Sequence, residues 1–311
     1  MTPDYLRRAR DCFDAALEEE PRYAAASVAL AECYCFMARW GSPPHDVMPK
    51  AKQLAQAAIE DDESSAEAYA VLGFVESAYE WDWVCAEGHF QRAIGLDARS
   101  LSVRCWYGDY LATVGRIGEA LRETRKAQEL EPASILVNAH AAKMLYSARR
   151  YGDAKELLLS VCEEAPGLFV THWYLGLTLL ETASPRLALE SLERAAELAG
   201  DCPSLLGAIG YARAVDGDIA GALESIGRLE QLARTAQVPA IDFAIVYMGL
   251  GDSDRAFELL DEAMEERALF LSWLPVWPLF DGLRSDPRYA GLLERMNLKA
   301  KSRLESAQSE L

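Results

Sequence analysis

The sequence predicts an all-α fold, a solenoid of stacked helical hairpins, because small residues recur in it at a fixed step. One comb consists of alanines that are 34 residues apart over most of the chain, with steps of 35 and 42 near the N-terminus. A second comb of Gly and Ala usually lies 12 positions before the first. Self-similarity at one period is the signature of a repeat protein. The first comb is Ala9, Ala51, Ala86, Ala120, Ala154, Ala188, Ala222 and Ala256, and the second is Ala31, Gly73, Gly108, Ala142, Gly176, Gly210 and Ala244.

Residues 101–134 show the repeating unit most clearly. They are typical of two amphipathic helices, with Gly115 in the turn between them and Pro132 after the second. Glycine tolerates the left-handed conformation at a helix C-terminus, and proline cannot continue a helix. Where the helices cross, a Gly or Ala lets the backbones approach, and large residues fill the space between hairpins. One hairpin cannot bury its apolar face alone, so the units must stack.

The unit resembles the tetratricopeptide repeat family, whose pattern is large-x-x-Leu-Gly-x-x-Tyr, then Ala-x-x-x-Phe-x-x-Ala, then Pro. The pattern fits units that begin near residues 101, 135, 169, 203 and 237, and two stretched units that begin near 24 and 66. The resemblance implies a right-handed superhelix over residues 1–268, with a half repeat at 4–21, followed by a C-terminal cap and tail over 269–311. It also implies a concave groove, lined by the leading helix of each hairpin.

The chain starts with the second helix of a repeat, over residues 4–20, without a first helix before it. This helix either caps the array or follows further repeats in a longer protein. We expect the longer protein, because Leu6, Phe13 and Leu17 keep the usual core pattern, whereas a native cap turns a polar face outward. On this interpretation Met1 is not the natural start.

Two stretched repeats depart from the 34-residue step. The link RWGSPPHDVMP carries eight extra residues, and Pro43, Pro44 and Pro49 predict that it does not continue the helix. We expect a tolerated loop there, although insertions in repeat arrays often mark a functional face. One extra residue falls in EWDW, where we expect Trp81 and Trp83 to fill a gap between helices rather than form a binding platform.

The repeat pattern stops after Ala268, where an apolar, proline-broken stretch begins. A final helix is predicted from about Pro287, with Asp286 as its N-cap, and the polar residues 299–311 extend this helix or fray. We expect the large apolar side chains of the stretch to cover the open end of the last hairpin. They include Trp273, Trp277, Phe280 and Leu283.

Three segments sharpen the resemblance: WDWVCAEGHFQRAIGLD, AIVYMGLGDSDRAFELLDEAMEER and LRSDPRYAGLLERM. They are similar to the C-terminal repeat region of multidomain bacterial signalling proteins. In those proteins a winged-helix DNA-binding domain, a Ser/Thr kinase domain or a nucleotide cyclase domain stands upstream. The resemblance implies a sensory or interaction module and leaves the output activity unassigned.

The acidic composition argues against a nucleic-acid partner and favours a basic or apolar protein or peptide, unless the charge serves solubility alone. The formal net charge is −18, whereas the phosphates of nucleic acid require a basic face. The seven cysteines are odd in number and scattered, which indicates reduced thiols rather than disulfides. No secretion signal opens the sequence and no apolar run is long enough to span a membrane, so we expect a cytoplasmic location.

The sequence offers no sign of catalysis. Its four histidines, His45, His89, His140 and His172, do not pair at a metal-ligand spacing, and the sequence lacks a glycine loop for phosphate. We therefore expect no enzyme activity, no metal and no cofactor.

The predicted binding site is the concave groove, where aromatic and charged side chains mix as they do at recognition surfaces. Each of these residues has the alternative of packing between helices, above all Trp173 and Tyr174. Some family members grip a C-terminal carboxylate with Lys, Asn and Arg, and only Lys143 qualifies here. The predicted groove residues are Glu32, Phe74, Trp106, Asp109, His140, Lys143, Trp173, Tyr174, Leu177 and Tyr211.

Our leading hypothesis is a non-catalytic module that binds a peptide or protein segment in this groove. A small-molecule effector-sensing domain is the second hypothesis, which a closed, ligand-sized pocket favours, while an open channel favours a peptide. The third is self-association as a homodimer, through the apolar segment 269–283 or the N-terminal helix.

Overall fold

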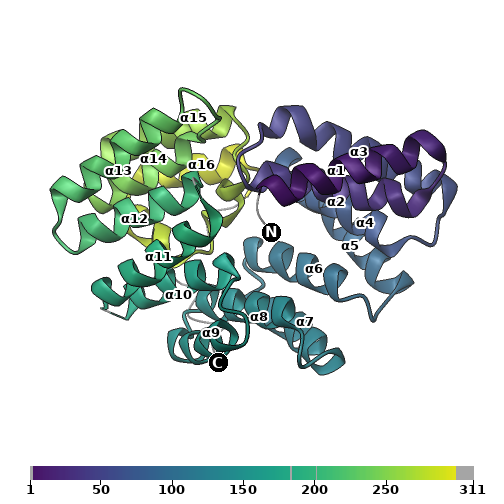
Figure 1. Ribbon diagram of the computed structural model, residues 1–311, viewed down its shortest axis with the longest axis horizontal. Helices are drawn as coiled ribbons and strands as arrows, with labels where there is room; N and C mark the ends of the chain where they lie inside the picture. The colour runs from purple at the N-terminus through teal and green to yellow at the C-terminus, as the bar shows by residue number, and fades with distance from the viewer. Residues whose placement is uncertain (1–2, 183, 201, 299–311) are drawn as a thin grey trace.

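The computed structural model describes residues 3–182, 184–200 and 202–298, and this part of the chain is all-α, without a strand (Figure 1). Its helices pack in consecutive pairs, so the predicted helical solenoid is confirmed. Within the same residues, no helix combines the length and the apolar character needed to cross a bilayer.

A single helix, α1 (Pro3–Glu19), packs against the first pair, and two 3-10 helices and a last α-helix follow the final pair. The pairs are α2 (Ala24–Arg39) with α3 (Pro44–Asp61), α4 (Ala66–Val75) with α5 (Trp83–Leu96), α6 (Leu101–Thr113) with α7 (Ile117–Leu130), α8 (Ile135–Ser147) with α9 (Tyr151–Glu164), α10 (Phe169–Glu181) with α11 (Pro185–Ala199), α12 (Pro203–Val215) with α13 (Ile219–Leu232), and α14 (Ala240–Gly249) with α15 (Ser253–Glu265). The elements after them are η2 (Leu269–Trp273), η3 (Pro278–Leu283) and α16 (Pro287–Arg295).

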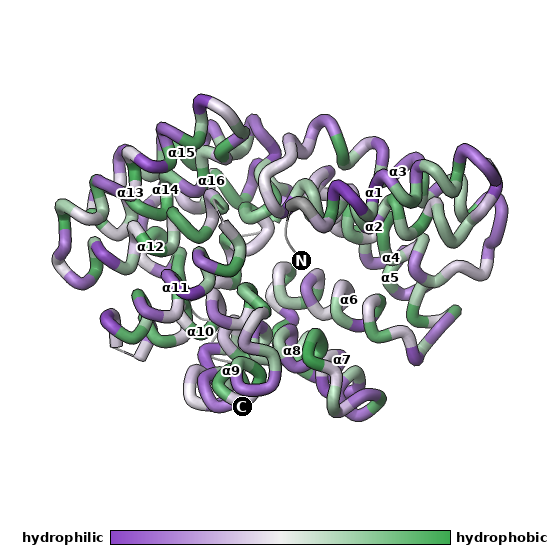
Figure 2. The backbone as a smooth tube through the Cα atoms, in the orientation of Figure 1, coloured by the Kyte–Doolittle hydropathy of each residue, from purple (hydrophilic) through white to green (hydrophobic). Residues whose placement is uncertain are grey.

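The leading helix of each pair lies in an inner layer and the second helix in an outer layer. In α6 most side chains from Val103 to Thr113 are buried, whereas α7 buries only the stripe Ala120, Thr124 and Ala127. Figure 2 shows hydrophilic residues at the outer turns of the pairs. The inner layer therefore forms the core, and any groove must lie on its exposed side.

The small residues of the two combs lie where the helices of a pair cross. Every comb alanine from Ala51 to Ala256 is fully buried. A Cβ atom added to Gly176 would lie 2.6 Å from Cγ of Leu192 and 3.1 Å from the carbonyl oxygen of Ala188. The close approach of α10 to α11 thus requires glycine, as the comb pattern predicts.

Two predictions about helix ends are confirmed. Gly115, Gly217 and Gly251 adopt the left-handed conformation in the turns, with φ values of 81°, 88° and 76°. Asp286 caps α16, because its side chain accepts a hydrogen bond from the backbone N–H of Arg288 at 2.9 Å.

The single extra residue of the second stretched repeat forms a π-helix, η1 (Glu76–Glu80), which continues α4. Trp81 ends it in the left-handed conformation, with a φ of 59°. Trp81 and Trp83 are buried, and the guanidinium of Arg267 lies 3.8 Å from the ring centroid of Trp81. The prediction that these tryptophans fill a gap between helices is confirmed.

Helix α2 ends at Arg39, so the prediction that the link does not continue this helix is confirmed, but the expectation of a loop throughout the link is wrong. Pro44 begins α3 at a position where its missing N–H leaves no bond unmade, and Pro49 lies inside the helix. Burial of Val47 and Met48 in the core outweighs the hydrogen bond that Pro49 cannot donate. Only residues 40–43 of the link remain outside helices.

The helical extension of α3 also makes a contact that joins distant parts of the chain. His45 lies in its first turn. Its ring nitrogens lie 3.0 Å from the hydroxyl of Tyr79 and 2.9 Å from the carbonyl oxygen of Glu265. The extra residues thus link the second repeat to the end of α15.

The C-terminal segment does more than cover the last hairpin. Helix α16 packs on α15, where Arg288 pairs with Asp254 at 2.8 Å. Residues 269–283, by contrast, turn back along the inner layer, where their large apolar side chains fill a face that water would otherwise contact. The indole N–H of Trp83 donates to the carbonyl oxygen of Met296 at 2.6 Å. The end of the solenoid therefore lies against its beginning (Figure 1).

Candidate binding site on the inner face

The inner face brings most of the predicted groove residues together, but in two separate groups. One group surrounds the carboxylate of Asp109, and the other packs beside segment 269–283. The first is Phe74, Trp106, Asp109, His140 and Lys143, and the second is Trp173, Tyr174 and Leu177. Glu32 and Tyr211 are half-buried and join neither group.

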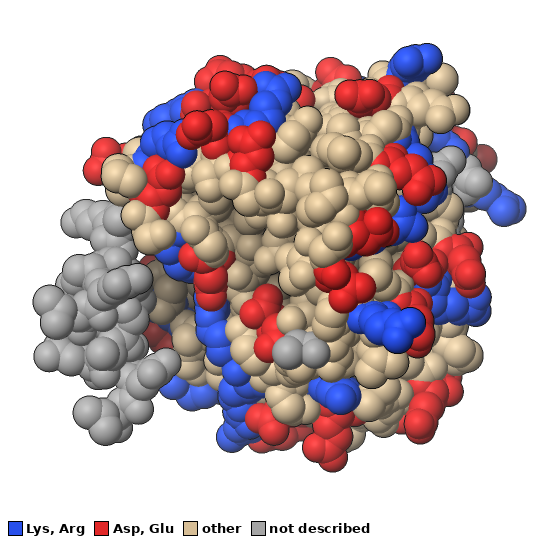
Figure 3. Space-filling view, turned by 90° about the vertical axis from the view of Figure 1, so that its left-hand side faces the viewer, with Lys and Arg blue, Asp and Glu red and all other residues tan. Residues whose placement is uncertain are grey.

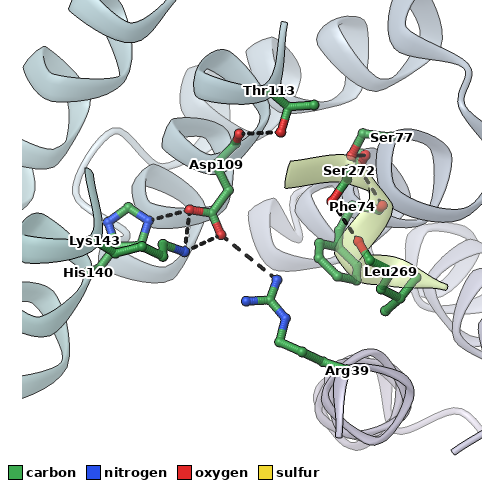
Figure 4. A network of polar contacts seen from close by, with 10 residues as sticks. Arg39, Phe74, Ser77, Asp109, Thr113, His140, Lys143, Leu269 and Ser272 are labelled. Atoms are coloured by element: carbon green, nitrogen blue, oxygen red, sulfur yellow. Dashed lines mark hydrogen bonds and ion pairs between the residues drawn. The ribbon is translucent and has the colours of Figure 1, made fainter. Parts of the chain in front are cut away.

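Asp109 is the centre of a buried network of polar contacts (Figure 4). Nζ of Lys143 lies 2.6 Å from Oδ1 and 2.8 Å from Oδ2 of Asp109, and Nε2 of His140 lies 2.7 Å from Oδ1. The guanidinium of Arg39 approaches the same carboxylate at 3.9 Å. Asp109 and Lys143 are 34 positions apart, so they occupy equivalent places on the leading helices of neighbouring repeats.

The network sets three basic side chains against one acidic side chain. Burial by itself raises the pKa of Asp109, but Lys143, His140 and Arg39 outweigh burial and hold this pKa well below its ordinary value. Burial lowers the pKa of His140, yet its acidic neighbours Cys105 and Asp109 raise it to about 9. Burial lowers the pKa of Lys143, and Asp109 acts against that shift. Three basic side chains, those of Arg39, His140 and Lys143, therefore face the one carboxylate of Asp109.

Aromatic rings flank the network where it reaches solvent. The ring centroid of Trp106 lies 5.1 Å from that of Phe74 and 6.0 Å from that of Phe36. The guanidinium of Arg39 lies 5.5 Å from the ring centroid of Phe74. The side chain of Arg39 is 18% exposed and that of Asp109 12%, so a small group can reach them from outside.

Segment 269–283 covers the rest of this face. Nζ of Lys143 lies 4.7 Å from the ring centroid of Trp273, and Trp173 lies 6.0 Å from Trp277 between centroids. Figure 4 shows Leu269 and Ser272 of η2 beside Phe74. Because the segment is buried in its own chain, it presents little apolar surface for the homodimer that we expected through it.

The space left beside the segment is small. Cavities of about 10 Å³ lie there, enough for one water molecule each. One is lined by Asp242, Trp173 and Trp277 among others, and another by Arg39, Gln237 and Glu266 among others.

Arg39 is the residue of the network that the sequence pattern missed. It lies eight positions after Ala31, and the equivalent positions in later repeats hold Arg116 and Arg150. Those two arginines lie at the turns and pair with acidic residues of their own repeats, Arg116 with Glu119 and Arg150 with Asp153. Helix α2 runs further past its small comb residue than α6 does, and this extension places Arg39 on the helix rather than in a turn.

The thiols and the acidic side chains do not gather into a metal site among the described residues. All seven cysteines are free, as predicted. In the part of the chain that the structure describes, no three His, Cys, Asp or Glu side chains are grouped so that they could hold a metal ion.

No protein-family model matches the chain, but part of it resembles two curated sequences of a transcriptional regulator, HilA of Salmonella typhimurium and of Salmonella typhi. It is 30% identical to the transcriptional regulator HilA of Salmonella typhimurium over 132 residues. The match covers 42% of this chain and 24% of HilA, so the chain spans about a quarter of the length of the curated relatives that it matches.

Solved structures match a larger share of the chain. The human IFIT1 dimer with PPP-AAAA has a TM-score of 0.61 at 16% identity, covering 84% of this chain and 68% of IFIT1. The APC/C hetero-tetramer Cut9–Hcn1 has a TM-score of 0.59 at 17% identity and covers 94% of this chain and 59% of the matched one. Yeast Tom70 has a TM-score of 0.52 at 16% identity and covers 94% and 62%. These likenesses show that the chain has a tetratricopeptide-repeat-like fold.

Proposed function

We propose that this chain is a non-catalytic interaction module whose inner face binds a carboxylate-bearing end of a protein or peptide segment. The observation that carries this proposal is the charge balance at Asp109, on which Arg39, His140 and Lys143 converge. Buried positive charge that exceeds its partners is unfavourable unless an anion compensates it. A ligand carboxylate beside Arg39 would supply that charge and could pair with the guanidinium through two parallel hydrogen bonds.

The net charge of the whole chain makes the cluster of basic side chains at Asp109 a more specific place for an acidic ligand. The formal net charge is −18, and Figure 3 shows acidic side chains spread over the outer face on the side of α13. The net negative charge therefore repels an acidic ligand from the chain as a whole, and attraction is confined to places where basic groups outnumber acidic ones. The aromatic rings of Trp106 and Phe36 offer apolar contact next to that place.

Binding of short peptides tests the proposal. We would titrate the full chain calorimetrically with mixed-sequence hexapeptides that carry either a free or an amidated C-terminus. Free-acid peptides should bind about tenfold or more tightly than amidated ones, because a charge-assisted hydrogen bond is lost with the charge. Arg39→Gln should weaken the binding of free-acid peptides by about the same factor. Arg150→Gln, at an exposed arginine, is the matched control and should leave both affinities unchanged. Equal affinity for both peptide forms would contradict the proposal.

A small carboxylate effector is the second candidate, and one observation favours it. Segment 269–283 contacts Lys143 and fills the face beside the network, which limits the length of chain that fits there. Succinate, titrated in the same experiment, separates the two ligands. Tight, Arg39-dependent binding of succinate without binding of free-acid peptides would identify a small-molecule sensor.

We further propose that the chain is the interaction or sensory region of a bacterial transcription-regulatory protein that acts in the cytoplasm. The similarity to HilA supports this role, and free cysteines suit a reducing compartment. The coding sequence around this region provides the test. A DNA-binding domain in the same reading frame would support the proposal, and a kinase or cyclase domain there would replace it with a different output.

A homodimer through α1 remains a further prediction. Helix α1 buries Leu6 against the first pair but leaves Tyr5 exposed. Light scattering at high protein concentration measures the oligomeric state directly, and a monomer at all concentrations would remove this prediction.

A further inference from the structure

A cavity lies between the inner helices and the C-terminal segment, away from the Asp109 network. Helices α10, α12 and α14 contribute Trp173, Ser204 and Asp242 to its wall, and segment 269–283 contributes Phe270, Trp277 and Phe280. Its volume is about 10 Å³, which suits one group of the size of a water molecule.

Asp242 is the unusual member of this wall. It lies in the first turn of α14 and is fully buried. Neither carboxylate oxygen reaches hydrogen-bond geometry with a described residue, although the hydroxyl of Ser204 lies close enough to lower the pKa of Asp242. The start of α14 packs so closely on α12 that a Cβ atom added to Gly207 would lie 2.7 Å from the carbonyl oxygen of Asp242. The carboxylate is thus fixed in place in a dry interior.

A buried carboxylate without a partner is strongly unfavourable, so it must take up a proton or a cation. No Lys, Arg or His is among the residues that line the cavity. The nearest acidic influence is Glu266, whose carboxylate accepts a hydrogen bond from the N–H of Ala240 at 2.9 Å. The protein itself therefore supplies no positive charge at this place.

We propose that this cavity binds a single ammonium ion, with Asp242 as its counter-ion. The two carboxylate oxygens and the hydroxyl of Ser204 can accept hydrogen bonds from such a group. Aromatic side chains form much of the remaining wall, and cations are attracted to aromatic rings.

The donor set distinguishes ammonium from a hard metal cation. Hard metal cations such as Ca²⁺ take about six to eight oxygen ligands, and Mg²⁺ about six. This wall offers the oxygens of Asp242 and Ser204 among largely apolar side chains. An ammonium group needs only a few acceptors and tolerates aromatic carbon on its other sides.

Binding at this place would also hold the C-terminal segment. Asp242 and Ser204 belong to α14 and α12, whereas Phe270 and Trp277 belong to the segment. A cation between them joins the two walls, so occupancy should stabilise the packing of residues 269–283.

Thermal and urea unfolding of the full chain tests the proposal. Ammonium chloride is the probe, and sodium chloride and tetramethylammonium chloride at equal ionic strength are the controls. The experiment is run at about pH 8, where protons compete least for the carboxylate. At a concentration about ten times its Kd, ammonium should raise the folding equilibrium constant about elevenfold. Sodium, which finds too few oxygens, and the bulky tetramethylammonium should not.

Asp242→Asn keeps the shape of the side chain and removes its charge, so this variant should lose the response to ammonium. Asp216→Asn, which changes an exposed aspartate at the end of α12, is the matched control and should respond like the parent chain. The NMR resonance of ¹⁵N-labelled ammonium gives a direct signal. Protons of the bound ammonium should exchange slowly with solvent in the parent chain and not in Asp242→Asn.

Three results would overturn the proposal: equal shifts with sodium and ammonium, a retained response in Asp242→Asn, or no protected ammonium resonance. The cavity then holds a water, or is empty beside a protonated Asp242. A water would satisfy the indole N–H groups of Trp173 and Trp277, which also lack partners among the described residues.

Discussion

At the scale of single residues, two glycines differ in the space that their surroundings leave for a side chain. A Cβ atom at Gly176 would overlap Leu192 and the backbone of α11, and neither can move without disturbing a packed crossing. Gly88, on α5, has no atom within 4 Å of the same position. Gly176→Ala should therefore destabilise the chain by about 1–3 kcal/mol, and Gly88→Ala should stabilise it by about 0.5–1 kcal/mol. Urea unfolding measures both, and effects of the same sign would contradict the assignment of crossings.

Asp242 gives stability a pH dependence that can be measured in ammonium-free buffer. Burial raises the pKa of Asp242 to about 7, with Glu266 in the same direction and Ser204 in the opposite one. Because the folded state binds this proton more tightly than the unfolded chain, the contribution is complete below about pH 4 and is lost as the pH rises through about 7. The loss should amount to about 2–4 kcal/mol in the parent chain.

Asp242→Asn isolates this contribution. The amide does not titrate, so the difference in unfolding free energy between variant and parent should grow between about pH 4 and 7 and then level off. Parallel curves for the two proteins over that range would show that Asp242 does not ionise there.

A sequence predicts the role of a residue when that role depends only on the local backbone. Gly115 follows a helix end and Asp286 precedes a helix start, and both behave as predicted. Arg39 and Asp242 could not be predicted in the same way, since their importance depends on what lies opposite them. A periodic pattern gives the face of a helix, but it does not give the charge of the neighbouring element.

At the scale of elements, the extra residues of both stretched repeats lie largely in helices rather than in loops. The eight extra residues lengthen α2 and α3, and the single extra residue becomes the π-helix η1. Local rules for Pro49 favour a break, but burial of the residues before it decides the outcome. Such competition is settled by tertiary packing, which a local sequence rule does not contain.

The C-terminal segment is the second element whose place differs from expectation. If it is part of the core rather than a loose strap, Trp277→Ala should lower the unfolding free energy by about 3–5 kcal/mol. The ring of Trp277 is buried and lies 5.2 Å from Trp273 and 6.0 Å from Trp173 between centroids. Tyr23→Ala, at an exposed aromatic residue, is the control and should change stability by less than about 0.5 kcal/mol.

Hydrogen exchange gives a second measurement of the same element. The N–H of Trp277 donates to the carbonyl oxygen of Trp273, and that of Leu274 to Leu271, both at 2.9 Å. These amides should exchange only through global unfolding if the segment belongs to the core. Exchange much faster than in α10 would show that the segment opens by itself.

At the scale of the whole molecule, the repeat architecture was predictable and its closure was not. The combs encode contacts between neighbours, because each step of 34 residues places the same position on the next pair. Trp83 and Met296 are 213 positions apart, and the contact between them has no counterpart in the repeat. The aromatic composition of 269–283 indicates that the segment must be buried, but the sequence does not say against which part of the inner face.

Closure should change how the chain unfolds. In an open solenoid each repeat touches only its neighbours, so terminal repeats can fray before central ones. Here Trp40, the residue after α2, lies 5.1 Å from Phe169 of α10 and 6.4 Å from Phe270 of η2, between ring centroids. These contacts couple the first repeat to the middle and the end of the chain. We therefore expect one cooperative transition, with coincident midpoints by far-UV circular dichroism and by tryptophan fluorescence.

Trp40→Ala should weaken the coupling between the first repeat and the rest of the chain more than it lowers the stability of any single repeat. The stability should fall by about 3–5 kcal/mol, and the two midpoints should separate as the first repeats unfold ahead of the rest. Leu136→Ala, at an exposed position of α8, keeps the contacts between the ends and should leave a single transition. Two resolved transitions in the parent chain would mean that the ends are held too weakly to act as one cooperative unit, and the inner face would then open without global unfolding.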